Sequence, residues 1–160
     1  MTKEVETNTA GQQATEEFVT VTIADQLFGL PIEQVQDVFM PDAITEVPMA
    51  APEVAGVLNL RGRIVTAIDM RKRLDLPIRE DGARRMAVGI ESKGESYGIV
   101  IDKVGEVLRL PRSTLEANPA NLDPRWASVA AGVQRLEGEL MVILNVDRVL
   151  DIGDSSQTAK

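Results

Sequence analysis

The amino-acid sequence predicts a mainly β protein made of two five-stranded barrels, with few short helices. Short runs of β-branched residues, broken by Gly, Pro and Asp, recur along the chain and favour strands over helices. Two blocks of sequence are also repeated in the same order, which indicates an internal duplication. Five short strands in each copy suit a small barrel, because closing a sheet removes its exposed edges.

The predicted strands follow one another closely. FVTVTI (18–23) alternates apolar and polar residues with a period of two, and the next run reads as the return strand of a hairpin. Helical signals are limited to one or two turns over 69–74 and over 147–150, and to a short turn after Ser113. The other predicted strands are 27–32, 63–70, 86–92, 96–101, 106–110 and 140–146.

The duplication is visible in two ungapped alignments. LFGLPIEQVQDV (27–38) aligns with SYGIVIDKVGEV (96–107), and GVLNLRGRIVTAIDMRKRL (56–74) aligns with GVQRLEGELMVILNVDRVL (132–150). Each copy therefore supplies a hairpin, a strand, a connector and a second hairpin. The glycines that the two copies share are expected at turns or bulges, where the chain needs a positive φ or a sharp bend.

These boundaries define the expected domain organisation. One ordered domain is expected over 17–152, with a first subdomain over about 17–80 and a second over about 84–152. The polar segments 1–16 and 153–160 have no hydrophobic periodicity and are expected to be disordered tails.

Composition excludes several kinds of chemistry. The chain has no Cys and no His, which removes disulfides, thiolate chemistry, the commonest general base and the commonest transition-metal ligand. Its net charge of −8 disfavours nucleic acid as a general partner. No apolar run approaches the roughly 20 residues of a membrane span, and the polar N-terminus does not resemble a signal peptide. A cytoplasmic protein with no cofactor, no metal and no membrane insertion is expected.

No catalytic set of residues assembles from the sequence, since there is no Ser–Lys pair and no phosphate-binding loop. An enzyme with an unusual carboxylate site stays an alternative, and so does a barrel that binds nucleic acid through a basic stretch. That stretch, 61–85, has eight basic and four acidic residues. It is interpreted either as a solvated surface or as a docking face for an acidic partner.

One pair of charges distinguishes the two copies. Asp37 and Arg61 stand at defined places in the first copy, and Glu106 and Glu137 stand at the corresponding places in the second. If the two motifs are adjacent in each half, only the first copy can form an ion pair. Arg63, which follows in the same hairpin, is interpreted as a surface charge.

Four segments in order carry a family resemblance: LFGLPIEQVQDV, AITEVPMAAPEVAGVLNLRGRIVTAIDMRKRL, YGIVIDKVGEVLRL and AAGVQRLEGELMVILNVDRVL. Over about residues 16 to 152 the chain resembles the CheW family of chemotaxis coupling proteins. The resemblance implies two SH3-like β-barrels and an adaptor without catalytic activity. It also implies two partners, the regulatory domain of the histidine kinase CheA and the cytoplasmic tips of methyl-accepting chemotaxis receptors, in arrays on the inner face of the membrane.

The resemblance also implies roles for particular residues. The positions matched to receptor binding, in a groove between the barrels, are Arg61, Asp37, Ile32, Val35 and Val38. The positions matched to kinase binding are Ile44, Thr45, Gly56 and Val57. The alternative is that Val35, Val38 and Val57 belong to the hydrophobic core and that Gly56 is needed for its backbone conformation. The tail after Leu150 is short and polar, which argues against a C-terminal helix contributing to the groove.

Overall fold

The computed structural model describes residues 14–77 and 85–151, which form two β-sheets and a few short helices. The six-stranded sheet has the order β8-β1-β2-β11-β10-β9, and the five-stranded sheet has the order β3-β6-β7-β5-β4. The first sheet consists of β1 (Thr15–Ile23), β2 (Gln26–Pro31), β8 (Lys103–Pro111), β9 (Leu115–Glu116), β10 (Ala130–Leu136) and β11 (Glu139–Leu144). The second consists of β3 (Val35–Phe39), β4 (Val54–Leu60), β5 (Arg63–Asp69), β6 (Met86–Ser92) and β7 (Glu95–Ile101). The mainly β prediction is confirmed.

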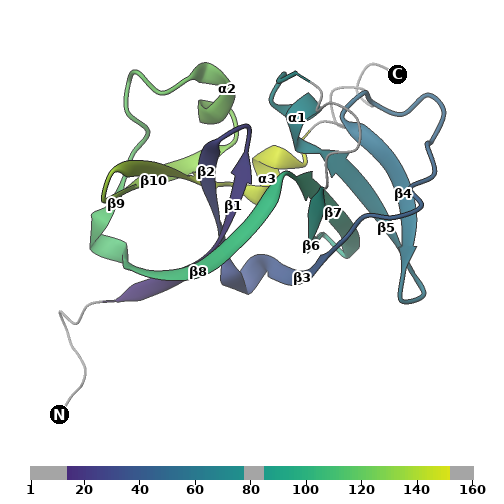
Figure 1. Ribbon diagram of the computed structural model, residues 1–160, viewed down its shortest axis with the longest axis horizontal. Helices are drawn as coiled ribbons and strands as arrows, with labels where there is room; N and C mark the ends of the chain where they lie inside the picture. Colours follow the sequence, from purple (N-terminus) through teal and green to yellow (C-terminus); the bar gives the residue numbers. More distant parts are fainter. Residues whose placement is uncertain (1–13, 78–84, 152–160) are drawn as a thin grey trace, which may run out of the picture.

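Each sheet combines strands from both halves of the sequence. The β1–β2 hairpin joins the C-terminal strands, by antiparallel pairing with β8 and parallel pairing with β11. The β6–β7 hairpin joins the N-terminal strands in the same way, through β3 and β5. Figure 1 shows the result as two lobes side by side, with β1, β2, β8 and β10 in one and β4 to β7 in the other. Neither half therefore contains a complete sheet, and the expected division at about residues 80 to 84 does not coincide with the division into sheets.

The two sheets are built to one plan, as expected of a duplicated chain. Under the repeat, β2 corresponds to β7, β3 to β8, β4 to β10 and β5 to β11, so the two strand orders match. After each edge strand, β8 or β3, the chain pairs with the strand at the opposite edge of the same sheet. After β8, β9 pairs with β10, and after β3, Thr45 bridges Val57 of β4. No ladder in the described residues joins β3 to β4, and we call this opening between them the β3–β4 seam.

The largest part of the core lies between the two exchanged hairpins. Its fully buried side chains come from β1, β2, β6, β7, β10 and β11 and from the short helices α1 (Met70–Arg73) and α3 (Val146–Val149). Smaller clusters lie in each sheet, one around Val65 and one around Met141. Burial of these apolar side chains away from water is the main stabilising term, and it joins the two sheets into one unit.

The short helices form where capping residues precede them. The carboxylate of Asp69 accepts hydrogen bonds from the backbone N–H of Arg71 (3.0 Å) and of Lys72 (3.3 Å) and so begins α1, as the sequence predicted. The predicted turn after Ser113 lies within η2 (Arg112–Thr114), and η1 (Ile32–Gln34) precedes β3. The helix α2 (Pro124–Ala127) was not predicted, although Asp123 caps it and Pro124 occupies its first position.

The N-terminal strand begins earlier than expected. Thr15 pairs with Pro111 and Glu16 pairs with Leu110, so the end of the expected 1–16 tail belongs to β1. The backbone pairing is joined by an ion pair between Glu16 and Arg112, at 3.5 Å between Nη1 and Oε1. The rest of that tail, 1–13, and the expected tail 153–160 lie outside the described residues.

The shared glycines serve two different purposes. Gly62 and Gly138 lie in hairpin turns with φ of +84° and +80°, as expected. Gly29 and Gly98 lie inside strands and not at turns or bulges, which corrects the prediction. A Cβ at Gly29 would come within 2.9 Å of the Met141 side chain, so this glycine makes room for a packed neighbour.

Candidate functional site

The turn between β4 and β5 presents Arg61 to solvent. Arg61 and Gly62 are the two loop residues, and both have positive φ, 53° and 84°. This pair of values is that of the type I′ turn, which matches the twist of the flanking strands. The side chain of Asn59 supports the turn by accepting a hydrogen bond from the Gly62 N–H (2.9 Å). Arginine is an unusual residue for this backbone conformation, which Gly and Asn adopt at lower cost.

Asp37, in the middle of β3, forms an ion pair with Arg61. The Arg61 guanidinium donates through Nη1 to Asp37 Oδ2, and the other carboxylate oxygen accepts the Val38 N–H at 2.8 Å. The hydrogen bond from Arg61 lowers the pKa of Asp37 below its ordinary value, against a smaller opposing effect of burial. The Arg61 side chain is 71% exposed and that of Asp37 is 21% exposed. The ion pair expected from the sequence is therefore present, and it spans the β3–β4 seam.

A cavity of about 450 Å³, here called the seam cavity, lies beside this ion pair. Its apolar walls are Phe39, Leu60, Val65, Ile90 and Tyr97. Its other walls are Gln36, Asp37, Arg61, Arg63, Gly89 and Ser96. The site thus combines a mostly apolar hollow with charged and polar side chains at the same place, which is the usual composition of a binding site.

Arg63 is exposed, in agreement with its interpretation as a surface charge, and hydrogen bonds also hold it in this site. Its Nη2 donates to Ser96 Oγ at 3.0 Å and to Gln36 Oε1 at 3.4 Å. Gln36 in turn donates through Nε2 to Glu91 at 2.7 Å. The hydrogen bonds of Arg63 and the cavity were not predicted from the sequence. The available signal was the repeat itself, because Ser96 of the cavity aligns with a leucine, Leu27, in the other copy.

The apolar residues expected in the receptor groove do not gather around this ion pair. Ile32 lies in η1 and lines a separate hollow of about 370 Å³, together with Glu17 and Arg109. Val35 packs against the shared core, as expected if it is a core residue and not part of the receptor groove. Val38 is 39% exposed and is not among the seam-cavity residues. The structure therefore brings together Asp37 and Arg61 but not the whole predicted set.

The four residues expected at the kinase contact lie together along β4. Thr45 and Val57 exchange two backbone hydrogen bonds of 2.8 Å. A Cβ on Gly56 would overlap the carbonyl oxygen of Thr45, and Gly56 has a φ of +145°. Ile44 packs against the core of this sheet. A Cβ on Gly132, the counterpart of Gly56, would also lie too close to a neighbouring backbone, 2.7 Å from the carbonyl oxygen of Glu116 in β9, so close backbone packing accounts for this glycine.

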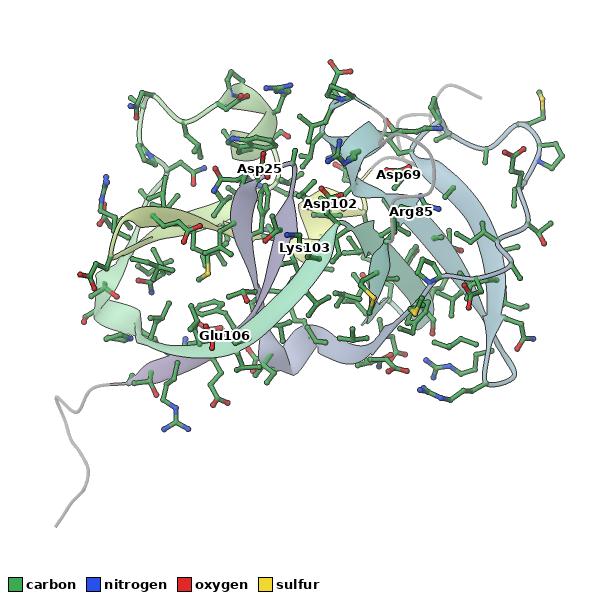
Figure 2. All side chains as sticks on the ribbon, in the orientation of Figure 1. Asp25, Asp69, Arg85, Asp102, Lys103 and Glu106 are labelled. Atoms are coloured by element: carbon green, nitrogen blue, oxygen red, sulfur yellow. The ribbon has the colours of Figure 1, made fainter. Side chains whose placement is uncertain are left out.

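The basic stretch 61–85 does not form a single docking face. Arg61 and Arg63 stand at one end of β5, and the described arginines at its other end bind the protein itself. Arg73 donates to the carbonyl oxygens at the C-terminus of α3, at 3.0 Å and 2.7 Å. Arg85 lies 3.8 Å from Asp69, and the two residues lie together in Figure 2. Most of the described basic side chains of this stretch are therefore engaged in contacts within the protein.

Asp102 is bound within the protein. It immediately precedes β8, and it lies well apart from Glu106 of that strand in Figure 2. Its carboxylate accepts hydrogen bonds from Arg71 Nε (3.0 Å) and Nη2 (2.7 Å) and from the backbone N–H of Ala24 (2.9 Å). Only 10% of its side chain is exposed, so Asp102 is a structural group.

Two further searches cover the residues that the structure describes. No group of three or more carboxylate side chains there is placed to hold a metal ion. No helix in 14–77 or 85–151 has the length and apolar character needed to cross a membrane.

Comparisons with known proteins agree with the fold. The family model of the CheW-like domain matches residues 17–153. The chain is 27% identical over 159 residues to the chemotaxis protein CheW of Bacillus subtilis, covering 99% of this chain and 97% of that protein. It is 26% identical over 135 residues to the chemotaxis protein CheW of Thermotoga maritima, covering 84% and 87%. The crystal structure of the scaffolding protein TtCheW from Thermoanaerobacter tengcongensis has the same fold, with a TM-score of 0.77 at 24% identity over 87% of this chain and 94% of that chain.

Proposed function

This chain belongs to the CheW-like domain family, and on that premise we propose that it is a non-catalytic adaptor that couples methyl-accepting chemotaxis receptors to the histidine kinase CheA. It would act at receptor arrays on the inner face of the cytoplasmic membrane, with no cofactor of its own. The observation that carries the proposal is the Asp37–Arg61 ion pair, which holds an exposed arginine at the mouth of the seam cavity.

On the receptor side, the proposal rests on how Arg61 is presented. The guanidinium is exposed on a rigid two-residue turn, and a single bond to Asp37 orients it. A charge held in this way sets the orientation and rate of docking more than it sets affinity. Val38 and Ile32, both partly exposed on the segment next to Asp37, would add apolar contact area.

On the kinase side, the proposal rests on the β4 edge. Thr45 is exposed and Ile44 and Val57 are partly exposed, while the buried Gly56 lets the Thr45 segment lie close against β4. This edge lies on the same sheet as Arg61 but away from the turn that carries it. Two partners could then bind at once, and weak contacts repeated through an array would add up to a stable assembly.

The test is a pull-down of the purified chain with two probes, a receptor-tip fragment and the CheA regulatory domain. The proposal expects the wild-type chain to retain both probes. It expects Arg61→Glu to lose the receptor tip while it keeps the regulatory domain and its melting temperature. A wild-type chain that retains neither probe, under conditions where a known CheW retains both, contradicts the proposal.

A further inference from the structure

We propose that Gln36 is a positioning residue: it holds Arg63 away from Asp37 and so reserves that carboxylate for the arginine of the β4–β5 turn. With Arg63 held aside, the carboxylate orients Arg61 alone. The inference rests on the proposed function, in which Arg61 couples the receptor, and adds to it the device that decides which of two neighbouring arginines is oriented. It depends on the hydrogen bonds of Arg63, on a β-bulge that aims Gln36, and on a comparison of the two copies.

Two arginines compete for the one carboxylate. Arg61 and Arg63 flank Gly62 in the same hairpin, and both line the seam cavity together with Asp37. The hydrogen bond from Arg61 is the main cause of the lowered pKa of Asp37, and the charge of Arg63 lowers this pKa further, so Arg63 lies within electrostatic reach. Attraction between opposite charges does not by itself tell the two guanidinium groups apart, because each carries one full positive charge.

Neutral acceptors hold Arg63 in place. Its Nη2 donates to Ser96 Oγ at 3.0 Å and to Gln36 Oε1 at 3.4 Å. Among the described residues, Arg63 forms no ion pair. Gln36 is oriented in turn, because its Nε2 donates to Glu91 Oε1 at 2.7 Å, which leaves the amide oxygen to face Arg63. Glu91 therefore acts on Arg63 through the amide of Gln36.

A β-bulge aims Gln36 at this place. The strand β3 pairs with β6 through Val35 and Asp37, whose partners are adjacent residues of β6, so Gln36 is the extra residue between them. Consecutive residues of a regular strand point to opposite faces of the sheet. Gln36 and Asp37 nevertheless both line the seam cavity. The bulge therefore brings the group that binds Arg63 and the group that binds Arg61 to one cavity.

The second copy has the same bulge without the side chain. In β8, Gly105 and Glu106 lie opposite Thr20 alone, and Gly105 is the counterpart of Gln36. A Cβ on Gly105 would lie 2.5 Å from the Thr20 hydroxyl oxygen, so no side chain fits there. The counterpart of Thr20 in the first copy is Gly89, which has no side chain to fill that space. Glycine in place of threonine opposite the bulge thus makes room for Gln36.

The other members of this hydrogen-bond network also differ between the copies. Residues that cannot form the network take their places in the second copy: Glu139 for Arg63, Leu27 for Ser96 and Thr22 for Glu91. That copy has no ion pair to protect, because both corresponding places, Glu106 and Glu137, are acidic. The network and the ion pair therefore occur together, as expected if one serves the other.

Neutral acceptors suffice for this task because the competing attraction is weak. Arg61 and Arg63 are both exposed, and an exposed ion pair contributes little to stability, since water and salt screen the charges. A hydrogen bond from a charged donor to a neutral acceptor is at least as strong. Two such bonds hold Arg63 at Ser96 and Gln36, and the carboxylate of Asp37 is left to Arg61.

Receptor binding tests the role of Gln36. Gln36→Ala removes the acceptor, and Gln34→Ala is the matched control, because Gln34 is an exposed glutamine of η1 outside the network. Affinity for a receptor-tip fragment and for the CheA regulatory domain is measured by calorimetry, with thermal unfolding of each variant. Gln36→Ala should lose about threefold in affinity for the tip, in the range of one exposed ion pair. The control, and the affinity of both variants for the regulatory domain, should stay unchanged.

A second substitution separates positioning from a merely structural role. If Arg63 competes for Asp37 once Gln36 is truncated, its removal should restore the site. The double variant Gln36→Ala with Arg63→Gln should therefore regain the affinity for the tip that Gln36→Ala loses. Arg63→Gln alone should bind the tip as the wild-type chain does.

A titration tests the sorting of the two arginines without any partner. The pKa of Asp37 is measured by NMR of its carboxyl carbon. In the wild-type chain, Arg61→Gln should raise this pKa more than Arg63→Gln does, because it removes the hydrogen bond. In the Gln36→Ala background the effect of Arg63→Gln should grow and that of Arg61→Gln should shrink, since the two arginines then share the carboxylate.

The outcomes distinguish this inference from the proposed function. An equal effect of Arg63→Gln on the pKa of Asp37 with and without Gln36 overturns the inference and leaves the adaptor function standing. A loss of affinity in folded Gln36→Ala that Arg63→Gln does not restore overturns it as well. A wild-type chain that binds neither probe is a failure of the proposed function, and the titration still shows whether Gln36 sorts the arginines.

Discussion

Arg71 of α1 binds Asp102, which immediately precedes β8, through two parallel hydrogen bonds, Nε–Oδ1 at 3.0 Å and Nη2–Oδ2 at 2.7 Å. The same carboxylate accepts the N–H of Ala24, in the turn of the exchanged β1–β2 hairpin. The bond to Asp102 raises the pKa of Arg71, so the guanidinium stays charged. The pair joins the end of one sheet to the point where the chain enters the other.

Replacement of this arginine should destabilise the fold. Arg71→Met keeps the aliphatic part of the side chain but leaves Asp102, only 10% exposed, without its guanidinium. We expect the free energy of unfolding to fall by about 2 kcal/mol, in the range for hydrogen bonds to charged groups. Urea denaturation measures this, with exposed Lys72→Met as the matched control. Equal stability of the two variants would show that the link contributes nothing.

The Asp37–Arg61 ion pair should contribute stability in a pH-dependent way. The pKa of Asp37 is lowered in the folded protein, so its contribution is present above the ordinary aspartate value of about 3.9 and is lost as pH falls through the lowered pKa. The effect should be small, because both groups are near solvent and screened by salt. Melting temperatures of the wild-type chain and Arg61→Gln should differ most above about pH 5 and converge below about pH 4. A difference that is constant from pH 3 to pH 7 counts against the pair.

Gly56 should tolerate no side chain. Gly56→Ala would place a Cβ against the Thr45 carbonyl oxygen and hold alanine at a φ of +145°. We expect a loss of at least about 3 kcal/mol in the free energy of unfolding. Gly62→Ala is the control, since its φ is also positive (+84°) but its Cβ would meet open space, and it should cost about 1 kcal/mol. Similar losses in the two variants would refute the close approach as the cause.

The repeat predicted more of this fold than any single strand did. Because two blocks of each copy align without gaps, the positions of the hairpins, the helices after Asp69 and Asn145 and the charge difference at Arg61 could be inferred from sequence. The exchange of the two hairpins could not, because the alternation of residues in a strand specifies which face is buried and not which sheet the strand joins. Local patterns of β1 and β6 are compatible with either sheet.

The functional site was predicted in part for a similar reason. Arg61 was found because its charge differs from that of its counterpart, Glu137, and Asp37 was found as the acid that could pair with it. The seam cavity is lined by residues of several strands, among them Val65, Gly89 and Ser96, which only the folded sheet brings together. Ile32 and Val35 were matched to one groove, but the structure directs them to a separate hollow and to the core.

The most direct test of the account is receptor-dependent autophosphorylation of CheA, reconstituted with the wild-type chain or with Arg61→Glu, beside thermal unfolding of both proteins. The account predicts that wild-type protein supports activation and that Arg61→Glu loses most of it, with little change in melting temperature because Arg61 is exposed. Full activation by Arg61→Glu would contradict the account. A large fall in melting temperature that alone explains the lost activation would contradict it as well.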